Sequence, residues 1–357
     1  MVAANRRFGG PLLRCEPAGA LGLALASTLA LACSSRPQPE PSCGGPGCGG
    51  APVSPEFVES AEVEDDAVVP AGESVGEREA LELRADDGHA LRLWHRSPRV
   101  VDAALPPILL LHGRTWSSVP DFDLPSHPER STMVQFASRG AEVYAVDLRG
   151  YGESERDATG WISPTRARDD LLAAVDAVGE REGRAPVVVG WSMGSLVTHF
   201  AAQTRPDAFA GVVLYGYPLD HRTAIAGPKS VAEAGEAPPR AATTAEAAAE
   251  DFRTEGSIDA AAIEAFVAAA LAADPVRADW RARGEFAALK PESLTVPTMV
   301  IHGAGDPYAP AEAQAALFTR LGTNERRWVI LDQSDHAAHL ERVGPWIDAV
   351  FAFARAR

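Results

Sequence analysis

Positive charge and long apolar runs are both scarce in this sequence, and each absence excludes a class of protein. Against 49 Asp and Glu residues there are 33 Lys and Arg residues in 357, which gives a formal net charge of −16. Nucleic-acid binding through bulk positive charge is therefore excluded. The longest uncharged apolar stretch, residues 18–32, has 15 residues, fewer than the roughly 20 of a membrane-spanning helix. A polytopic membrane protein is thus excluded as well.

Cysteine is the third scarce feature. The chain has 4 cysteines and none after Cys48, so most of it needs no disulfide to fold. What is present is a globular composition, 46% hydrophobic and 23% charged. The length suits one large domain or two ordinary ones with a sizeable core.

The first 32 residues have the pattern of a secretory signal peptide. Arg6, Arg7 and Arg14 precede the apolar stretch, and small residues close it. This is the order of basic, hydrophobic and cleavage regions in such peptides. We therefore expect residues 1–32 to be removed on export, and they are excluded from the fold prediction.

The residues around Cys33 resemble the lipobox of bacterial lipoproteins. The segment reads Leu29-Ala30-Leu31-Ala32-Cys33, and the resemblance implies that the Cys33 thiol receives a lipid and anchors the mature chain to a membrane. Ala30 departs from the larger aliphatic residue that is usual at its place, and plain cleavage after Ala32 is the alternative. We expect a protein of the bacterial cell envelope, in the outer membrane if the cell is Gram-negative, because Ser34 rather than Asp follows the cysteine.

Residues 33–77 are predicted to be a flexible tether. They are rich in Pro, Gly, Ser and acidic residues, so they cannot bury enough apolar surface to fold alone. Cys43 and Cys48 lie here, where a short disulfide loop could form in an oxidising compartment, and two thiols are too few for a metal site. The tether would hold the following domain, residues 78–357, away from a membrane surface.

From residue 79 onward, strand and helix patterns alternate. Residues 80–84 and 90–94 alternate apolar and polar around Asp86-Asp87-Gly88, which predicts a hairpin. Helical spacing is found at 164–182 and 343–354, and short apolar runs predict six further strands at 108–111, 143–146, 187–189, 212–214, 298–301 and 328–331. The alternation predicts an α/β fold with an eight-stranded, mostly parallel sheet and helices on both faces.

This alternation is interrupted between about residues 219 and 290. Alanine makes up 15 of the 33 residues from 241 to 273, a composition that favours helices. Residues 243–246 read as a capping box, Asp274-Pro275 reads as a helix stop, and an apolar stripe is formed by Ile263, Phe266, Val267 and Leu271. We expect two or three helices inserted after the sixth strand as a lid over the strand ends, with a surface excursion of no functional role as the alternative.

The segment Gly190-Trp191-Ser192-Met193-Gly194 fits the motif G-x-S-x-G. It follows the apolar run 187–189 and precedes a helical pattern, which is the strand, sharp turn and helix of a nucleophile elbow. The glycines permit the tight turn and keep side chains clear of the serine. Ser192 is therefore the candidate nucleophile.

With this motif the chain resembles the α/β-hydrolase family, in its serine esterase and lipase-like branch, over residues 78–357. Further segments carry the resemblance: His112-Gly113-Arg114 after a strand, 147–154 with the pattern D-x-R-G-x-G-x-S, 302–310, and Ser334-Asp335-His336 after the last strand. The resemblance implies that the backbone N–H groups of Arg114 and Met193 form an oxyanion hole. It also implies that residues 147–154 support the floor of the site without reacting.

Ser192, Asp306 and His336 come in the chain order of a catalytic triad in this fold. Ser192 would attack a carbonyl carbon, His336 would accept its proton and return it to the leaving group, and Asp306 would orient the imidazole. His339 competes with His336, and the spacing His336-Ala-Ala-His339 also suits a metal pair, although no third ligand supports zinc. Its position directly after the strand favours His336.

These residues predict an exported serine hydrolase that cleaves carboxylic esters through an acyl-serine intermediate. A serine nucleophile argues against the haloalkane dehalogenase and epoxide hydrolase branches, which need an aspartate. Peptidase, carbon–carbon bond hydrolase and acyltransferase activities stay open, as does a non-catalytic lipoprotein that binds an envelope ligand. We expect a small-molecule acyl substrate, no cofactor, no metal and no nucleic-acid partner, with membrane contact through Cys33.

Overall fold

An eight-stranded sheet organises the residues that the structure describes, which are 75–235 and 240–357 of this computed structural model. The strand order is β1-β2-β4-β3-β5-β6-β7-β8. In chain order the strands are Glu79–Arg84 (β1), Ala90–Arg96 (β2), Ile108–Leu111 (β3), Val143–Asp147 (β4), Val187–Trp191 (β5), Gly211–Tyr215 (β6), Thr298–Gly303 (β7) and Arg326–Leu331 (β8).

The N-terminal predictions fall mostly outside this range. The signal peptide (1–32), Cys33, Cys43, Cys48 and the tether as far as residue 74 lie outside the described residues. The last tether residues are already paired, because Val75 bridges Pro98 and the Gly76 N–H donates to the Ser97 carbonyl at 3.0 Å. Backbone pairing with the rest of the fold therefore begins at residue 75, and the first strand, β1, begins at Glu79.

The sheet is antiparallel at one edge and parallel elsewhere. β1 pairs antiparallel with β2, and β2 with β4, while all pairs from β4 through β3, β5, β6 and β7 to β8 are parallel. The strands from β3 to β7 are buried along their whole length, as expected where helices cover both faces. The predicted eight-stranded, mostly parallel sheet is confirmed.

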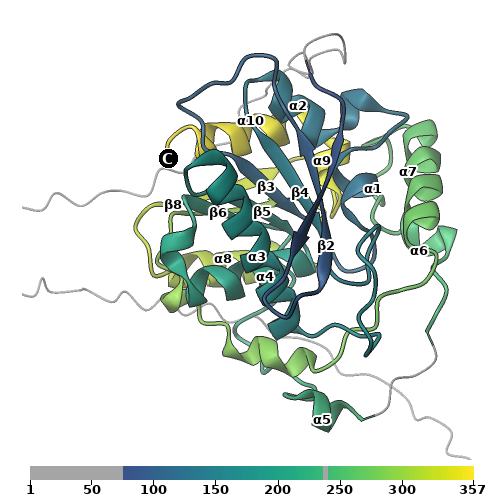
Figure 1. Ribbon diagram of the computed structural model, residues 1–357, viewed down its shortest axis with the longest axis vertical. Helices are drawn as coiled ribbons and strands as arrows, with labels where there is room; N and C mark the ends of the chain where they lie inside the picture. The colour runs from purple at the N-terminus through teal and green to yellow at the C-terminus, as the bar shows by residue number, and fades with distance from the viewer. Residues whose placement is uncertain (1–74, 236–239) are drawn as a thin grey trace, which may run out of the picture. The chain divides into compact units, whose positions relative to one another are not determined.

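Helices lie on both faces, as Figure 1 shows. Alternate residues of β3 belong to different cores: Leu109 and Leu111 pack in one, Ile108 and Leu110 in the other, because successive side chains of a strand point to opposite faces. The first core is completed by α3 (Pro164–Glu182), α4 (Met193–Thr204) and α8 (Ala311–Arg320), and the second by α2 (Thr132–Ser138) and α10 (Val343–Ala354).

Local sequence signals fix helix α3 at the predicted bounds. Its N-cap Ser163 accepts a hydrogen bond from the Arg166 N–H, Pro164 occupies the first helical position, and Gly183 ends the helix at φ 68°. The buried face includes Leu171 and Val175. Each signal lies within the helix or next to it, which is why the sequence alone predicted it.

The predicted insertion lies between β6 and β7. It contains α5 (Val231–Ala234), α6 (Ala245–Ala249) and α7 (Ala260–Ala273), followed by 3₁₀ turns at Arg283–Ala288 and Pro291–Ser293. The predicted cap was wrong by one residue, because Thr244, not Thr243, accepts from the Ala247 N–H, and Thr243 Oγ1 donates to the Asp274 carbonyl. The helix stop at Asp274-Pro275 is confirmed.

The insertion packs on loops that follow the strands. Phe266 on α7 contacts Trp116 edge-on, with ring centroids 6.4 Å apart, in a small core completed by Leu124, Ala248, Ala270 and Leu340. Trp116 precedes α1 (Ser118–Phe122), and Leu340 lies on α9 (Ala338–Glu341), both of which lie near α6 and α7 in Figure 1. Of the predicted stripe only Phe266 is fully buried, and Ala262 and Ala270 share its face.

No helix among the described residues combines the length and the apolar character that crossing a membrane requires.

Candidate active site

Ser192 stands between strand β5 and helix α4 in a strained conformation. Its φ of 53° and ψ of −121° are rare for a residue with a side chain. Its N–H donates to the Tyr215 carbonyl at 2.8 Å, and its side chain is half-buried. The surrounding structure therefore holds this serine at the end of a strand with its hydroxyl accessible, as a nucleophile elbow requires.

Two glycines make this turn possible by allowing close approach. A Cβ on Gly190 would collide with Thr198 Oγ1 and with the Gly194 carbonyl, and a Cβ on Gly194 would collide with the carbonyls of His112 and Leu111. Any larger residue at either position would push α4 away from β5 or from the loop after β3. The glycines of the motif therefore have the steric role that the sequence predicted.

Asp306 and His336 form a buried pair. Asp306 follows β7, and its Oδ2 lies 2.9 Å from His336 Nδ1, while its Oδ1 accepts the backbone N–H groups of Tyr308 and Ala309 at 2.9 and 3.1 Å. These bonds hold the carboxylate with one oxygen directed at the imidazole. Burial alone lowers the pKa of His336, but the hydrogen bond and charge of Asp306, aided by the charges of Asp251 and Glu341, raise it more, so the net pKa lies above its ordinary value.

The three predicted residues gather around the end of β6. A Cβ on Gly216, the residue after β6, would lie 3.0 Å from His336 Cε1 and 3.3 Å from Asp306 Oδ2, and Ser192 is bonded to the preceding residue, Tyr215. Among the described residues no hydrogen bond yet joins Ser192 Oγ to His336 Nε2. Such contacts are often loose without substrate and tighten when it binds.

His339 has a different environment from His336. Its Nδ1 lies 3.0 Å from the Tyr215 hydroxyl and its Nε2 lies 2.8 Å from the Asp121 carbonyl. It is fully buried, and burial lowers its pKa to about 3. Both ring nitrogens are occupied by structural hydrogen bonds, so His339 is available neither as a base nor as a metal ligand.

Two aromatic residues fix the loop that carries His336. Trp191 Nε1 and the Tyr215 hydroxyl both donate to the His336 carbonyl at 2.8 Å. Trp191 is 2% exposed and Tyr217, two residues after Tyr215, is fully buried. Both therefore belong to the core.

A hydrogen bond from His112 orients one backbone N–H group in the loop after β3. His112 Nε2 accepts from the Leu148 N–H at 3.1 Å, so its Nδ1 carries the proton and donates to the Gly113 carbonyl at 2.8 Å. In a trans peptide the N–H of the next residue points opposite to that carbonyl. The N–H of Arg114 is thereby turned away from His112, and a Cβ on Gly113 would lie 3.4 Å from Ser192 Cβ. His112 thus orients the loop.

Asp147 ties this loop to the segment 147–154. Its Oδ1 accepts the Ser118 N–H at 2.9 Å, and its Oδ2 accepts the Glu153 N–H at 3.1 Å and Trp94 Nε1 at 3.0 Å. The Ser154 hydroxyl donates to the Asp147 carbonyl at 2.6 Å. The predicted supporting segment thus holds the start of α1, which follows the loop of Arg114.

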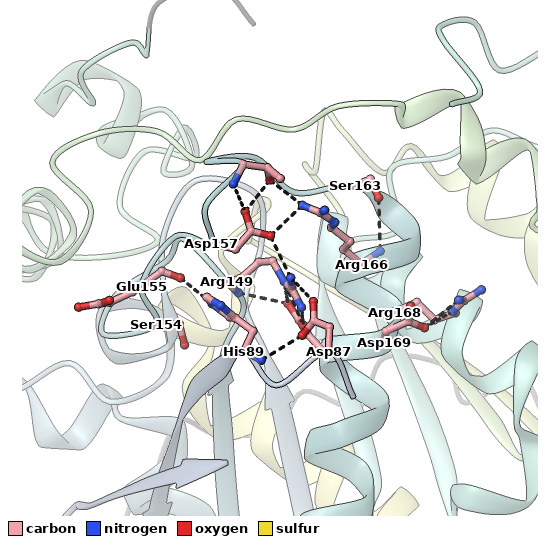
Figure 2. A network of polar contacts seen from close by, with 12 residues as sticks. Asp87, His89, Arg149, Ser154, Glu155, Asp157, Ser163, Arg166, Arg168 and Asp169 are labelled. Atoms are coloured by element: carbon pink, nitrogen blue, oxygen red, sulfur yellow. Dashed lines mark hydrogen bonds and ion pairs between the residues drawn. The ribbon is translucent and has the colours of Figure 1, made fainter. Parts of the chain in front are cut away.

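Arg149 in the same segment is the centre of a polar network (Figure 2). Its guanidinium lies between Asp87 at 2.7 Å and Asp157 at 3.1 Å, and it pairs with the fully buried Asp170 at 2.5 Å. Arg166 reaches Asp157 from the other side at 2.8 Å. The hydrogen bond from Arg149 lowers the pKa of Asp87 to about 2. The network fastens the β1–β2 hairpin and α3 to the loop behind the site.

The insertion contributes a carboxyl group that the sequence did not reveal. Asp251, just after α6, is half-buried and close enough to His336 for their charges to interact. Burial raises its pKa to about 6, with the charges of Asp306 and Glu250 acting in the same direction and His336 opposing them. No motif in the sequence pointed to Asp251, because only the fold of the insertion carries it to the site.

One group of side chains in the described part of the chain has metal-ligand chemistry, and it lies elsewhere. His95, Glu142 and Glu182 have ligand atoms within 4.8 Å of one another. These groups already bind protein partners, since His95 Nε2 lies 2.8 Å from Glu142 Oε2 and the Tyr144 hydroxyl donates to Glu182. They also lie at the amino end of β4, whereas Ser192 follows the carboxyl end of β5.

Comparisons with known proteins bear on this geometry. A family model described as serine aminopeptidase, S33, matches residues 128–343, more than half of the chain. No curated protein matches the sequence.

Solved structures resemble the described fold. An esterase from Thermogutta terrifontis with malate bound is 21% identical, covering 78% of this chain and 98% of its own with a TM-score of 0.57. The esterase RhEst1 from Rhodococcus sp. ECU1013 is 20% identical, covering 77% and 98% with a TM-score of 0.54. A serine hydrolase involved in carbazole degradation is 15% identical, covering 79% and 100% with a TM-score of 0.55. At these identities the likeness shows a shared fold only.

Proposed function

Because the chain belongs to the S33 serine aminopeptidase family of α/β-fold serine hydrolases, we propose that it cleaves carboxylic esters through an acyl-serine intermediate. The proposed triad is Ser192, His336 and Asp306. The observation that carries this proposal is the 2.9 Å contact between Asp306 Oδ2 and His336 Nδ1, beside a serine held at φ 53°.

The proposed reaction begins with the tautomer that Asp306 selects. With Nδ1–H donating to the carboxylate, His336 Nε2 is free to accept the Ser192 proton as Oγ attacks the carbonyl carbon. The N–H groups of Arg114 and Met193 would bind the resulting oxyanion. Met193 begins α4, and the first N–H groups of a helix have no partner within it.

The remaining steps release both products. His336 gives its proton to the leaving alcohol as the ester C–O bond breaks, which leaves an acyl group on Ser192. Water then attacks this acyl group while His336 takes one of its protons, and the acid leaves as Ser192 recovers its hydrogen. The inserted α6 and α7 would act as a lid over this site, a role supported by the packing of Phe266 on Trp116.

The test compares the full chain with Ser192→Ala on para-nitrophenyl butyrate. We expect hydrolysis by the natural chain and loss to the background rate in Ser192→Ala, while Ser138→Ala, a half-buried serine at the end of α2, keeps full activity. A fluorophosphonate should label the natural chain at Ser192. A folded natural chain with no hydrolysis and no label would overturn the proposal and favour the non-catalytic lipoprotein instead.

Aminopeptidase activity is the second candidate, and Asp251 favours it. With a pKa of about 6, this carboxyl is mostly ionised at neutral pH, and its negative charge near His336 could hold the ammonium group of a peptide N-terminus. Aminoacyl para-nitroanilides distinguish the two candidates. Cleavage of these amides that falls in Asp251→Asn, with ester hydrolysis unchanged, would make the protein a peptidase.

We further propose that the protein is exported and anchored through a lipid on Cys33. The support is the basic and apolar N-terminal pattern and the lipobox-like segment Leu29–Cys33. Labelled palmitate fed to a producing bacterium should enter the natural chain and not Cys33→Ser. Label in both proteins, or in neither when the chain is exported and cleaved, would contradict the anchor.

A further inference from the structure

A cavity of about 410 Å³ lies beside the Arg114 loop, between the segments that flank α6 and α7 of the insertion. Asp279 is the acid among its lining residues, and five others are arginines: Arg114, Arg240, Arg277, Arg281 and Arg283. The chain as a whole carries a net charge of −16. The cavity is therefore a positively charged region in a chain that is negatively charged overall.

Most of this positive charge has no partner in the part of the chain that the structure describes. Arg281 neutralises Asp279, with its Nε 3.1 Å from Asp279 Oδ2, and it also donates to the Gly235 carbonyl. Within the described residues, the side chains of Arg114, Arg277 and Arg283 form no ion pair and donate no hydrogen bond. Among the described residues, three guanidinium groups that share one cavity are thus free to contact a ligand.

These guanidinium groups are close enough to repel one another. Burial lowers the pKa of Arg114, and the positive charges of Arg283 and Arg277 lower it further. An anion placed among them would remove this repulsion and gain charge-assisted hydrogen bonds, for which the planar guanidinium suits carboxylate and phosphate oxygens.

Backbone hydrogen bonds form the walls of the cavity in advance. The Arg281 N–H donates to the Ile162 carbonyl at 2.8 Å, and the Ile162 N–H donates to the Asp279 carbonyl at 2.9 Å. On the other side, the Arg277 N–H donates to the Ala241 carbonyl at 3.0 Å. A preformed wall lowers the cost of ordering a ligand, as is usual for small-molecule sites.

The cavity is connected to the proposed nucleophile through the loop of Arg114. A Cβ on the neighbouring Gly113 would lie 3.4 Å from Ser192 Cβ, so the Arg114 backbone lies on the order of 10 Å from Ser192, given the spacing of consecutive Cα atoms. The Tyr151 hydroxyl donates to the Arg114 carbonyl and accepts from Trp280 Nε1, which belongs to a lining residue. Arg114 therefore belongs both to the proposed oxyanion loop and to the cavity lining, and a ligand of both places would extend along this loop.

We propose that this arginine-lined cavity binds an anionic group of the substrate, so that the preferred ester has an acyl part ending in a carboxylate or phosphate. The inference rests on the proposed esterase function of Ser192 and names its substrate class. Arg277 and Arg283 are the specificity-determining residues, and the overall acidic surface would repel such a substrate everywhere except at the site.

The experiment measures kcat/KM of the full chain on matched pairs of esters. One member of each pair is a mono-para-nitrophenyl ester of a linear dicarboxylic acid, and the other has its free carboxylate capped as a methyl ester. A third series carries a terminal phosphate. We expect the natural chain to prefer an anionic member about tenfold, the effect of one charge-assisted contact, and the preference to shrink as ionic strength rises.

The variants test whether these arginines cause the preference. The double variant Arg277→Gln, Arg283→Gln should bring the ratio of kcat/KM on the anionic ester to kcat/KM on the neutral ester to about one. The corresponding double lysine variant should keep most of the preference for the anionic ester. Arg327→Gln, an exposed arginine on the edge strand β8, is the matched control and should change nothing. If the double variant unfolds, Arg283→Glu is the substitute variant, because an exposed position tolerates this change, and it should lower the preference for the anionic ester.

Each result has one meaning for the cavity. A preference for carboxylate or for phosphate that disappears with the arginines supports the proposal and identifies the anion. Hydrolysis of neutral and anionic members at equal rates, or a preference that survives in the double variant, overturns it while leaving the esterase function intact. If no ester is hydrolysed and Ser192 takes no fluorophosphonate label, the esterase function itself fails.

Discussion

The carboxyl edge of the sheet and the inserted segment between β6 and β7 are held together by different forces. At the sheet edge, buried strands and a strained backbone fix Ser192, and Asp306 and His336 are at most 4% exposed. Helices α6 and α7 of the insertion instead rest on a small apolar core of their own and on single carboxylates that bind backbone N–H groups. We infer that the first region determines the rate of the chemistry, and the second determines which substrate reaches it.

Replacing Asp306, the proposed triad acid, should distinguish the two regions most clearly. Asp306→Asn keeps the shape but loses the charge and favours the wrong imidazole tautomer, so we expect kcat to fall about 10⁴-fold with little change in KM. Steady-state kinetics on a neutral ester measure this. Asp332→Asn removes an exposed carboxylate after β8 and should have no effect, and equal losses in both variants would refute the assignment.

Removing Arg149 should weaken the sheet region without touching the site. Its side chain is 2% exposed and its partner Asp170 is fully buried, so Arg149→Ala leaves an uncompensated buried carboxyl and should lower the free energy of unfolding by about 3–5 kcal/mol. Burial raises the pKa of Asp170. Once Arg149 is removed, Asp170 can therefore take up a proton, which should keep the loss of unfolding free energy near the lower end of this range. Urea unfolding is the measurement. The half-exposed pair of Arg168 and Asp169 (Figure 2) is the control, and Arg168→Ala should cost at most about 1 kcal/mol.

The pH dependence of kcat/KM reports the electrostatics of the sheet edge. The proposed reaction needs neutral His336, whose pKa is raised above its ordinary value, so activity on a neutral ester should fall about tenfold per pH unit below that pKa. Asp251 faces His336 from the insertion and helps to raise this pKa. Asp251→Asn should therefore move the inflection to lower pH. An unchanged inflection would mean that the insertion has no electrostatic influence on the base.

The smallest predicted effect tests the insertion alone. Asp274 Oδ2 accepts the Ser117 N–H at 2.8 Å and its Oδ1 accepts the Gly152 N–H at 2.9 Å. Asp274→Ala leaves two N–H donors unsatisfied, which should lower the free energy of unfolding by about 1–3 kcal/mol. It should also raise KM severalfold and leave kcat nearly unchanged. Glu264→Ala, exposed on α7, is the control. A fall in kcat that matches Asp306→Asn would abolish the distinction between the regions.

Prediction from sequence succeeded where the signal was local. The bounds of 164–182 and 343–354 match α3 and α10 because apolar periodicity marks both helices, and α3 also has the Ser163 cap. The adjacent Thr243 and Thr244 offer the same cap chemistry, and only tertiary contact with Asp274 decides between them. Ala262 and Ala270 are buried on α7, yet alanine gives no hydrophobic signal strong enough to predict which face turns inward.

Residues of the site that are far apart in sequence could not be predicted in the same way. Asp306 and His336 were found because each follows a strand at a recognisable motif. Asp251 belongs to no motif, and neither do the other cavity arginines, which meet Arg114 only because the chain returns from 240 and 277–283 to its loop. Long-range placement of this kind depends on how the insertion packs, which no short window of sequence records.

The bond between the insertion and Asp335 limits how such a protein can be rebuilt. Asp335, directly before His336, accepts the N–H groups of Arg253 and Thr254 and the Thr254 hydroxyl at 2.8 Å. A chimaera that transplants residues 216–297 into a related sheet must therefore bring a carboxylate to the position before the histidine. Modular exchange of such segments, in the laboratory or in evolution, requires at least one compensating change outside the module.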